Sequence, residues 1–469
     1  MSPESQPHRP SYGAASIRAG VVRLARWGVC ALLLSGCATV RRAREAQDTS
    51  HIPVGERPAT PAETGLAPGA EVTLDEATRA AAMCHPSIAR ARQQVIAAEA
   101  QLRQAGAARA PEVSASAGYS RRTANTEAGD FSFHSNEGYT ASLGLDLLVF
   151  DFGCTPAQVR AAAARCAAAV ENLRSAENTV RYEVRSAFFQ LGKARELRQV
   201  AEEAVRQYEE NLEQVRAFVE VGRRTRYDVT KSEVDLGNAR LELMDARNTE
   251  ASAQATLATR IGLAEHPGWR AGEGRLEDVP GDVADWMAVA RTMNPDLAAL
   301  NAQETAASAS VDEAVASLYP SFNLRLNADG SGDGFPLVWN ASGALSSAVT
   351  LFDSRRRLSR IDEAAANLRS VRAQRAERES ALHLELQRAR SDRDTARERF
   401  ELSDLILRQA RESLALVSEQ YRLGRASALE VTDAQVAVTR AQAGRVQAQY
   451  DWQAAVAQVL YTIGGEEAP

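Results

Sequence analysis

The stretch VGRRTRYDV at residues 221–229 returns as LGRASALEV at residues 423–431, with a glycine, a hydroxyl residue, an acidic residue and a final valine at matching positions. The same offset of 202 relates three further pairs: 150–151 and 352–353, 229–230 and 431–432, and 261–262 and 463–464. An offset of 209 relates residues 85–86 and 111 to residues 294–295 and 320. The seven-residue difference falls between residues 111 and 150, as expected of a surface loop, because loops accept insertions. The chain is therefore an internal duplication.

Each copy has the pattern of a helix, two strands, a very long helix and a returning helix. The first helix is expected over residues 87–110, since Pro111 disfavours the helical conformation in the residue before it. The long helix is expected to begin with Thr155 as its N-cap and to end near Val221. Its apolar residues from 170 to 219 recur at alternating steps of three and four, and the second copy keeps this phase. The heptad pattern predicts helices about 100 Å long in left-handed coiled-coil packing.

Two segments in each copy alternate apolar with small polar residues, which is the period of a strand. The first copy has them at residues 113–120 and 139–147, separated by a polar loop at 121–137. The second copy has them at residues 322–326 and 339–349. Their length is about the 9–11 residues that cross a bilayer in a β-barrel. The alternation alone fits a soluble β-hairpin equally well.

Composition excludes several classes of protein. The 469 residues include 55 basic and 61 acidic side chains, so no basic excess indicates nucleic-acid binding. The region after the first 37 residues has no run of about 18 apolar residues, which excludes a polytopic helical membrane protein. The bias towards Ala, Gln, Glu, Arg and Leu is typical of long helices.

The N-terminal residues 1–36 have the pattern of a secretory signal peptide, with a basic leader and a short apolar run. The sequence LSGC at 34–37 resembles a bacterial lipobox, in which Cys37 becomes the lipidated first residue; an ordinary signal peptide with an unrelated cysteine is the alternative. Ala38, in place of the aspartate that retains lipoproteins at the inner membrane, indicates the outer membrane. One acyl chain binds a membrane weakly, so a second attachment is expected. Residues 37–72 are proline-rich and are expected to form a tether.

The sequence offers little support for an enzyme. The six histidines have no partner within a helical turn, and no glycine-rich phosphate loop or nucleophile elbow is present. Cys84, Cys154 and Cys166, which remain after processing, fit no metal-binding spacing. No catalytic residue, cofactor or metal is predicted.

The duplicated unit, with its two strands, long helix and glycine-containing turn, resembles the TolC-type outer-membrane efflux protein family. The resemblance covers about residues 73–466, and the two turns resemble the Gly, Thr/Ser and Asp-Val pattern of the family's periplasmic helix tips. Glu430 replaces the usual aspartate, and Tyr227 stands where an aliphatic residue is common. The resemblance implies a mainly α fold with a small membrane β-barrel portion, assembled as a trimeric α-barrel and β-barrel channel in the outer membrane that extends into the periplasm.

The same resemblance implies a passive exit duct of a tripartite efflux pump or a type I secretion system. Its partners would be a periplasmic adaptor (membrane fusion protein), an inner-membrane transporter and outer-membrane lipid, with small compounds, metal ions or a secreted protein as cargo. The competing reading is a pore-less periplasmic coiled-coil lipoprotein scaffold. The predicted units are a first repeat at 73–265, a linker at 266–281 and a second repeat at 282–466.

Closure of the barrel predicts a homotrimer. Four strands in one chain leave edges that lipid cannot satisfy, and the smallest membrane barrels have about eight strands. Three chains would supply twelve, which is the family's arrangement.

The tip turns have a local role and a role that the resemblance implies. Glycine permits the backbone reversal, and the hydroxyl and acidic residues of each turn can form a capping box for the returning helix. The resemblance adds adaptor docking at these residues: Gly222, Thr225, Asp228, Val229, Gly424, Ser427, Glu430 and Val431.

Acidic residues near the tips are candidates for a gate. The pairs Glu213 with Glu220 and Glu412 with Glu419 are each seven residues apart and share a helix face. Threefold symmetry would turn an inward-facing member into a ring of carboxylates that attracts cations. Solvated side chains, or pairs with arginines such as Arg216 and Arg411, are the alternative.

Overall fold

The computed structural model describes residues 57, 59–67, 69–124, 134–221, 225–265, 267–272, 274–423 and 425–465, without the side chains of 122–124, 134–136 and 428. The predictions for the signal peptide, Cys37, most of the tether, Gly222 and Gly424 lie outside these residues.

The two copies have the same elements with the same helix lengths. The first copy comprises α2 (Leu74–Cys84), α3 (Pro86–Ala107), β2 (Glu112–Ala124), β3 (His134–Phe150), α4 (Cys154–Glu220) and α5 (Arg226–Ile261). The second comprises α6 (Val283–Met293), α7 (Pro295–Ala316), β5 (Ser321–Gly332), β6 (Val338–Ala348), α8 (Arg356–Arg422) and α9 (Ala428–Ile463). Both long helices have 67 residues and both returning helices have 36. The duplication and the mainly helical fold are confirmed.

Short elements lie before and between the copies. They are a 3-10 helix, η1 (Pro61–Thr64), and two strands, β1 (Glu71–Val72) and β4 (Arg270–Ala271), which pair in parallel. The β1–β4 pair therefore ties the segment before the first copy to the segment between the two copies.

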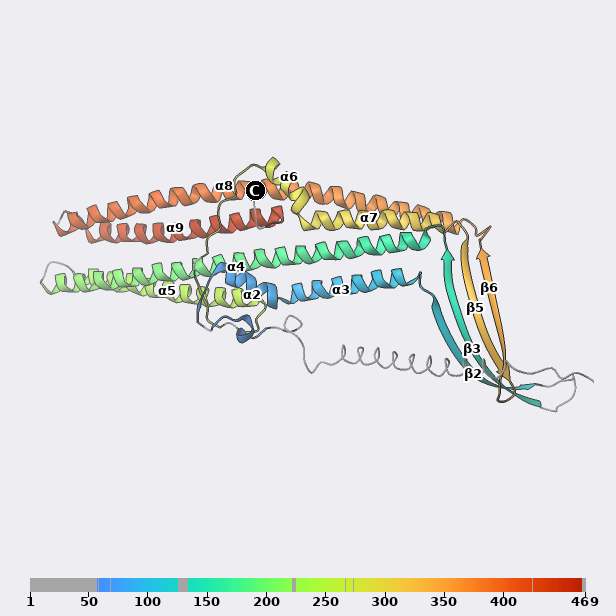
Figure 1. The fold of residues 1–469 in the computed structure, drawn as a ribbon. Coiled ribbons are helices and arrows are strands. Elements are labelled where there is room, and N and C mark those ends of the chain that lie inside the picture. The colour runs from blue at the N-terminus through green and yellow to red at the C-terminus, as the bar shows by residue number, and fades with distance from the viewer. Residues whose placement is uncertain are drawn as a thin grey trace, which may run out of the picture. The chain divides into compact units, whose positions relative to one another are not determined.

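The helices form a layer that is four helices wide along its length. Next to the strands, contacts give the order α3, α4, α7, α8 (Figure 1). In the half remote from the strands, α5 and α9 replace α3 and α7, so that the order is α5, α4, α9, α8. Within the described residues, no helix is long and apolar enough to cross a membrane.

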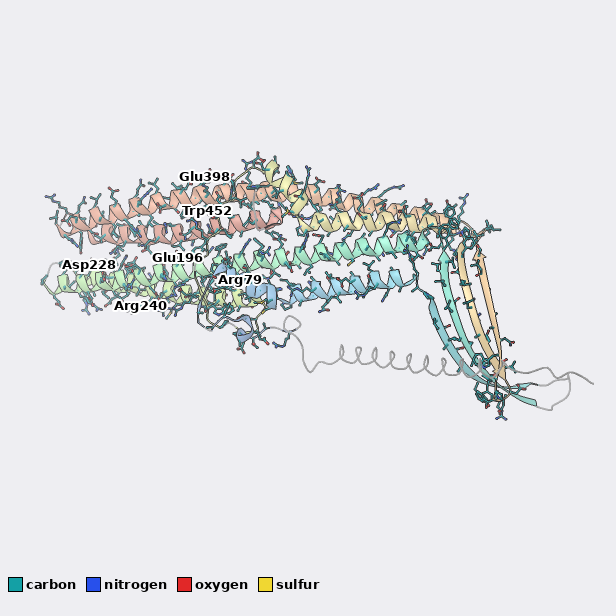
Figure 2. The ribbon with its side chains drawn as sticks, viewed as in Figure 1. Arg79, Glu196, Asp228, Arg240, Glu398 and Trp452 are labelled. Carbon is teal, nitrogen blue, oxygen red and sulfur yellow. The ribbon has the colours of Figure 1, made fainter. Side chains whose placement is uncertain are left out.

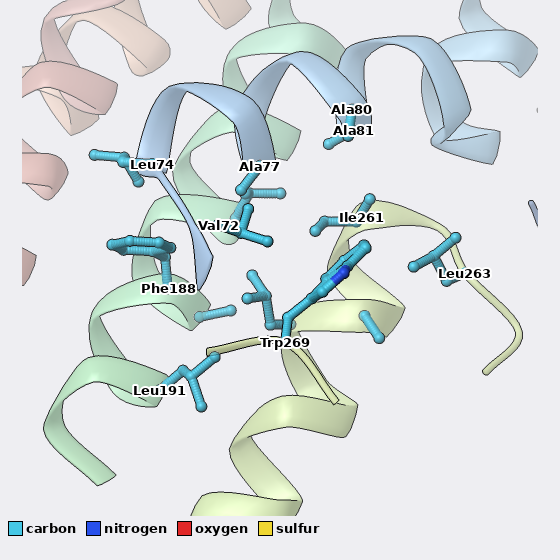
Figure 3. Packing of buried hydrophobic residues seen from close by; sticks show 14 of the residues in the cluster. Val72, Leu74, Ala77, Ala80, Ala81, Phe188, Leu191, Ile261, Leu263 and Trp269 are labelled. Carbon is cyan, nitrogen blue, oxygen red and sulfur yellow. The ribbon is translucent and has the colours of Figure 1, made fainter. Parts of the chain in front are cut away.

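The heptad phase predicted for the long helices is confirmed by burial. Val180, Val184 and Ala187 are buried in α4, and the residues 202 positions later, Leu382, Leu386 and Ala389, are buried in α8. Two apolar clusters form around these stretches, one for each copy. Figure 3 shows four residues of the first cluster, from four separate segments: Val72, Phe188, Ile261 and Trp269.

Each copy is closed by a glycine at the end of its returning helix. Gly262 and Gly464 have φ of +101° and +93°, in the left-handed region that favours glycine. A Cβ on Gly464 would lie 2.6 Å from the Cα of Asn294, at the start of α7. A Cβ on Gly262 would lie 2.9 Å from the carbonyl oxygen of Cys84, at the end of α2. The repeated Ile-Gly pair therefore packs the end of each returning helix against the helices that begin its copy.

Two expectations about element boundaries are wrong, those for the N-cap and for the loop, and the first helix agrees with its expected range to within three residues. Thr155 is not the N-cap, because α4 begins at Cys154 after Gly153, whose φ is +94°. Thr155 instead donates its backbone N–H to the carboxylate of Asp151 at 2.6 Å, which satisfies an N–H group of the first helical turn. The helix expected over 87–110 is α3, which begins at Pro86 and ends at Ala107, and α2 precedes it. The loop expected over 121–137 is shorter, since β2 continues to Ala124 and β3 begins at His134.

Candidate functional site

The four long strands form one antiparallel sheet in the order β2, β3, β5, β6. Its centre joins the two copies, because β3 of the first copy pairs with β5 of the second, Leu145 opposite Leu326. Apolar residues such as Leu143, Leu145 and Leu147 share one face of β3, as the alternation predicts. The opposite face is polar, and there Asp146 and Arg325 form an ion pair at 2.6 Å. A sheet with one apolar and one polar face fits a barrel wall between lipid and a water-filled channel.

Aromatic side chains mark both ends of this sheet. At the helix end, the ring of Phe152 lies 4.8 Å from that of Phe150 and is stacked on Tyr319 at 5.3 Å. At the other end, the ring of Tyr139 lies 5.2 Å from that of Tyr119. The twelve residues from Tyr139 to Phe150 span roughly 37 Å along β3, or about 26–28 Å along the membrane normal at a tilt of about 40–45°. That height matches an apolar band of roughly 25 Å between two aromatic girdles.

The outer strands β2 and β6 each have one strand partner among the described residues. Their remaining backbone N–H and C=O groups face outward from the sheet. In a hydrocarbon environment each unsatisfied group costs several kcal/mol, so these edges need further strands. The helical layer has matching edges, with α8 on one side and α3 and α5 on the other.

The two helix tips lie at the end of the helices remote from the strands, where Figure 2 places Asp228. The capping box predicted for the first tip is confirmed, since Asp228 Oδ2 accepts from the backbone N–H and the hydroxyl of Thr225 at 3.0 and 2.9 Å. At the second tip only half of the predicted capping box forms: Ser427 Oγ accepts from the backbone N–H of Glu430 at 3.3 Å, and the Glu430 carboxylate accepts from the Ser427 hydroxyl instead of its backbone N–H. Val229 and Val431 are half-buried in the first turns of α5 and α9.

Each tip also exposes a pair of apolar side chains that the sequence reasoning missed. Val221 and Tyr227 expose 68% and 74% of their surface at the first tip. Leu423 and Leu429 occupy the equivalent positions of the second tip and are also exposed. Apolar residues that flank a polar turn at the same place in both copies are the signal that identifies them. Together with the capping residues they form what we term the tip patches.

The four candidate gate residues are exposed, near the tips. Glu213 and Glu220 lie on the last turns of α4, and Glu412 and Glu419 lie near the end of α8. Arg216, offered above as a partner for the first pair, instead forms an ion pair with Glu233 of α5 at 2.8 Å. Glu419 forms an exposed ion pair with Arg422 of the same helix, at 3.7 Å between Oε2 and Nη1.

A sequence profile of the outer membrane efflux protein family matches residues 79–263 and 286–465. The chain belongs to this family. The two matched segments correspond to the two copies, and together they span most of the chain. The chain is thus an exit duct of the outer membrane, for efflux or type I secretion, with helices that extend into the periplasm. The family and the fold are those of channel proteins and not of known enzymes.

Individual relatives agree with this assignment. The protein CyaE of Bordetella pertussis is 27% identical over 402 residues, which cover 82% of this chain and 82% of that protein. The outer membrane protein VceC of Vibrio cholerae has a similar fold, with a TM-score of 0.72, 19% identity and coverage of 84% of this chain and 96% of that chain. The MtrE outer membrane channel of Neisseria gonorrhoeae gives a TM-score of 0.74, with 20% identity and coverage of 84% and 89%.

The two copies of this efflux protein also meet in the helical layer, where α4 contacts α9. The hydroxyl of Tyr450 donates to Glu196 at 2.8 Å, and Lys193 pairs with Asp451 at 3.1 Å. Figure 2 shows Glu196 on the side of α4 that faces α9. Burial, and then the bond to Glu196, raise the pKa of the Tyr450 hydroxyl well above its usual range, so it remains a donor at every physiological pH. This polar contact fixes one helical hairpin relative to the other.

Proposed function

We propose that the protein acts as a homotrimer in which three chains close both the β-sheet and the helical layer into one duct. The unpaired edges of β2 and β6 carry this proposal, because a membrane cannot satisfy their backbone groups. The free edges of the helical layer lie on the same two sides of the chain as the edge strands of the sheet. A single threefold axis would therefore close both layers. A pore-less scaffold in the periplasm does not explain the sheet, because its apolar face would lie in water without lipid to cover it.

The tip patches support docking of a periplasmic adaptor, which in turn connects the duct to an inner-membrane transporter. Exposed apolar pairs beside capped helix ends are a suitable surface for an apolar partner, and each chain presents two. The duct itself needs no cofactor, since transport through it follows from the energy supplied by the transporter. The carboxylates near the tips are the proposed gate, and acylation of Cys37 is the proposed second attachment to the membrane.

The oligomeric state tests the proposal. Purified protein in detergent should have three times the mass of one chain by native mass spectrometry, and it should give conductance steps in planar bilayers. A monomer that remains soluble without detergent would refute the duct closed by three chains. A variant with Leu145→Asp on the apolar face should fail to insert, whereas Ser142→Asp, on the polar face of the same strand, should insert normally.

A further inference from the structure

The turn that joins β6 to α8 carries exposed apolar and basic residues. Leu351 and Phe352 follow β6 and expose 92% and 84% of their surface. Arg355, Arg356 and Arg360 follow at the start of α8 and are also exposed. We term these five residues the junction patch. The turn between β6 and α8 that carries them lies where the sheet meets the helices (Figure 1).

The patch lies at the level of the periplasmic membrane surface. Ser321 pairs with Ala348, so the end of β6 lies beside the start of β5, next to Tyr319 of the aromatic group at the helix end. Aromatic belts sit at the headgroup level of a bilayer. Arg355 to Arg360 spans about 7 Å along α8, and one headgroup layer is roughly 5–7 Å thick.

Among the described residues, Arg355, Arg356 and Arg360 form no ion pair within 4 Å, although the charge of Arg356 acts on the nearby Asp353 carboxylate. The fourth arginine, Arg357, has a different role, because its Nε donates to Asp353 at 2.8 Å and its guanidinium donates to the carbonyl oxygens of Thr350 in the turn and of Ser317 at the end of α7. The Asp353 carboxylate therefore already has Arg357 as its ion-pair partner.

Other acidic groups near the patch do not remove its charge. Asp362 and Glu363 lie further from the sheet along α8. Glu313 of α7 and Glu363 line one surface pocket with Arg360 and Arg165, so carboxylates and guanidinium groups are equal in number there. Asp312 pairs with Arg160 at 3.0 Å. The side of the turn next to the sheet remains basic.

The first copy provides an internal comparison. Its residues 202 positions earlier are Gly153, Cys154 and Gln158 in place of the three arginines, in the same turn of the fold. Arg355 has φ of +67° where Gly153 has φ of +94°. A side chain is disfavoured in this left-handed region, so folding of the turn does not favour arginine there. The second copy carries three charges that the fold does not need.

We propose that the junction patch binds the phosphate headgroup of an anionic phospholipid in the periplasmic leaflet of the outer membrane. Leu351 and Phe352 contact the acyl chains, and Arg355, Arg356 and Arg360 contact the phosphate. Guanidinium groups suit phosphate oxygens because they donate several hydrogen bonds in a planar array. The proposal rests on insertion of the sheet into the membrane, as stated above.

A neighbouring copy of the chain is the competing occupant. If β6 pairs antiparallel with β2 of the next chain, Glu112 at the start of β2 comes near the end of β6. An ion pair from the patch to this carboxylate would contribute to assembly and not to lipid binding. The two readings differ in the effect of Glu112→Gln, which should weaken trimers only if the carboxylate is the partner.

The test compares two triple variants of the trimer in detergent. One is Arg355→Gln/Arg356→Gln/Arg360→Gln, and the control removes three other exposed arginines of the same helix, about 50–80 Å further along it: Arg388→Gln/Arg399→Gln/Arg411→Gln. Binding of phosphatidylglycerol and of phosphatidylcholine is titrated by native mass spectrometry. Each basic residue near an anionic surface contributes roughly fivefold, so the junction variant should bind phosphatidylglycerol on the order of 100-fold more weakly. Phosphatidylcholine binding should not change, and the control should behave as the wild type.

The single variant Arg355→Gly, which copies the residue of the first repeat, should bind phosphatidylglycerol roughly fivefold more weakly and should still fold. Inorganic phosphate should not compete with the lipid, which separates a membrane ligand from a free ion. Equal phosphatidylglycerol binding by the junction variant and the wild type would overturn the proposal, as would loss of trimers in the junction variant and in Glu112→Gln. Trimer mass and conductance are recorded on the same samples, so failure of the duct itself is seen separately.

Discussion

The contact between α4 and α9 depends on the absence of a side chain at Gly192. A Cβ there would lie 2.6 Å from Cε1 and 2.8 Å from the hydroxyl oxygen of Tyr450, closer than real Cβ atoms come. Gly192→Ala therefore has to displace the Tyr450 ring, which is held by its hydrogen bond to Glu196 at 2.8 Å. The variant tests whether the two copies are fixed to one another at this point.

The magnitude follows from three contributions. Loss of a hydrogen bond to a charged group costs about 1.5–3 kcal/mol. Overpacking of a filled site costs about 1–3 kcal/mol. Alanine regains about 1 kcal/mol through its higher helix propensity. The free energy of unfolding should fall by about 1.5–5 kcal/mol, measured by denaturant titration of the detergent-solubilised protein with circular dichroism.

Two further variants separate the clash from a general effect of alanine. Gly237 in α5 has no atom within 4 Å of a built Cβ, so Gly237→Ala should stabilise the protein by about 0.5–1 kcal/mol. With Tyr450→Ala as background, Gly192→Ala should cost less than about 1 kcal/mol, because the clashing ring is gone. The reasoning is refuted if Gly192→Ala is as stable as Gly237→Ala, or if its cost is the same on both backgrounds.

Three further predictions concern the anchor, the tips and the gate. Cys37→Ser should abolish labelling by radioactive fatty acid while the sheet still inserts, and labelling that persists would show that the cysteine is not acylated. Gly222→Pro or Gly424→Pro should abolish export in a transport assay and leave trimers intact, because proline cannot adopt the reversal that glycine permits; normal export by both would remove the tips from the mechanism. Glu412→Gln/Glu419→Gln should lower cation selectivity and block by multivalent cations in planar bilayers, and unchanged selectivity would exclude a carboxylate ring.

The pattern of buried residues along the long helices could be predicted from sequence because it repeats every seven residues. The heptad phase identified Leu382 and Leu386 as core residues, since each position is supported by many equivalents along the same helix. The helices α2 and α6 were missed because eleven residues contain too few turns to show a period. Their capping boxes, Thr73 with Glu76 and Asp282 with Asp285, were the available signal.

Strand ends and tertiary contacts were harder to predict, for different reasons. The hydrophobic alternation stops where the sheet leaves the apolar band, although the ladder continues through polar pairs such as Arg121 opposite Glu137. Thr155 carries the residue type of an N-cap, but the turn at Gly153 places the N-cap, and with it the helix start, two residues earlier. The fit of Gly192 against Tyr450 joins residues 258 positions apart and leaves no local signal.

The two copies differ in length only where a length change does no harm to the duct. An extra residue in α4 or α8 would rotate everything beyond it by about 100° and would move its apolar stripe out of the layer. It would also shift one tip relative to the other. The helices therefore match residue for residue, 67 against 67 and 36 against 36. The hairpin of β2 and β3 has strands of 13 and 17 residues against 12 and 11 in the second copy, because its far end lies beyond the aromatic girdle.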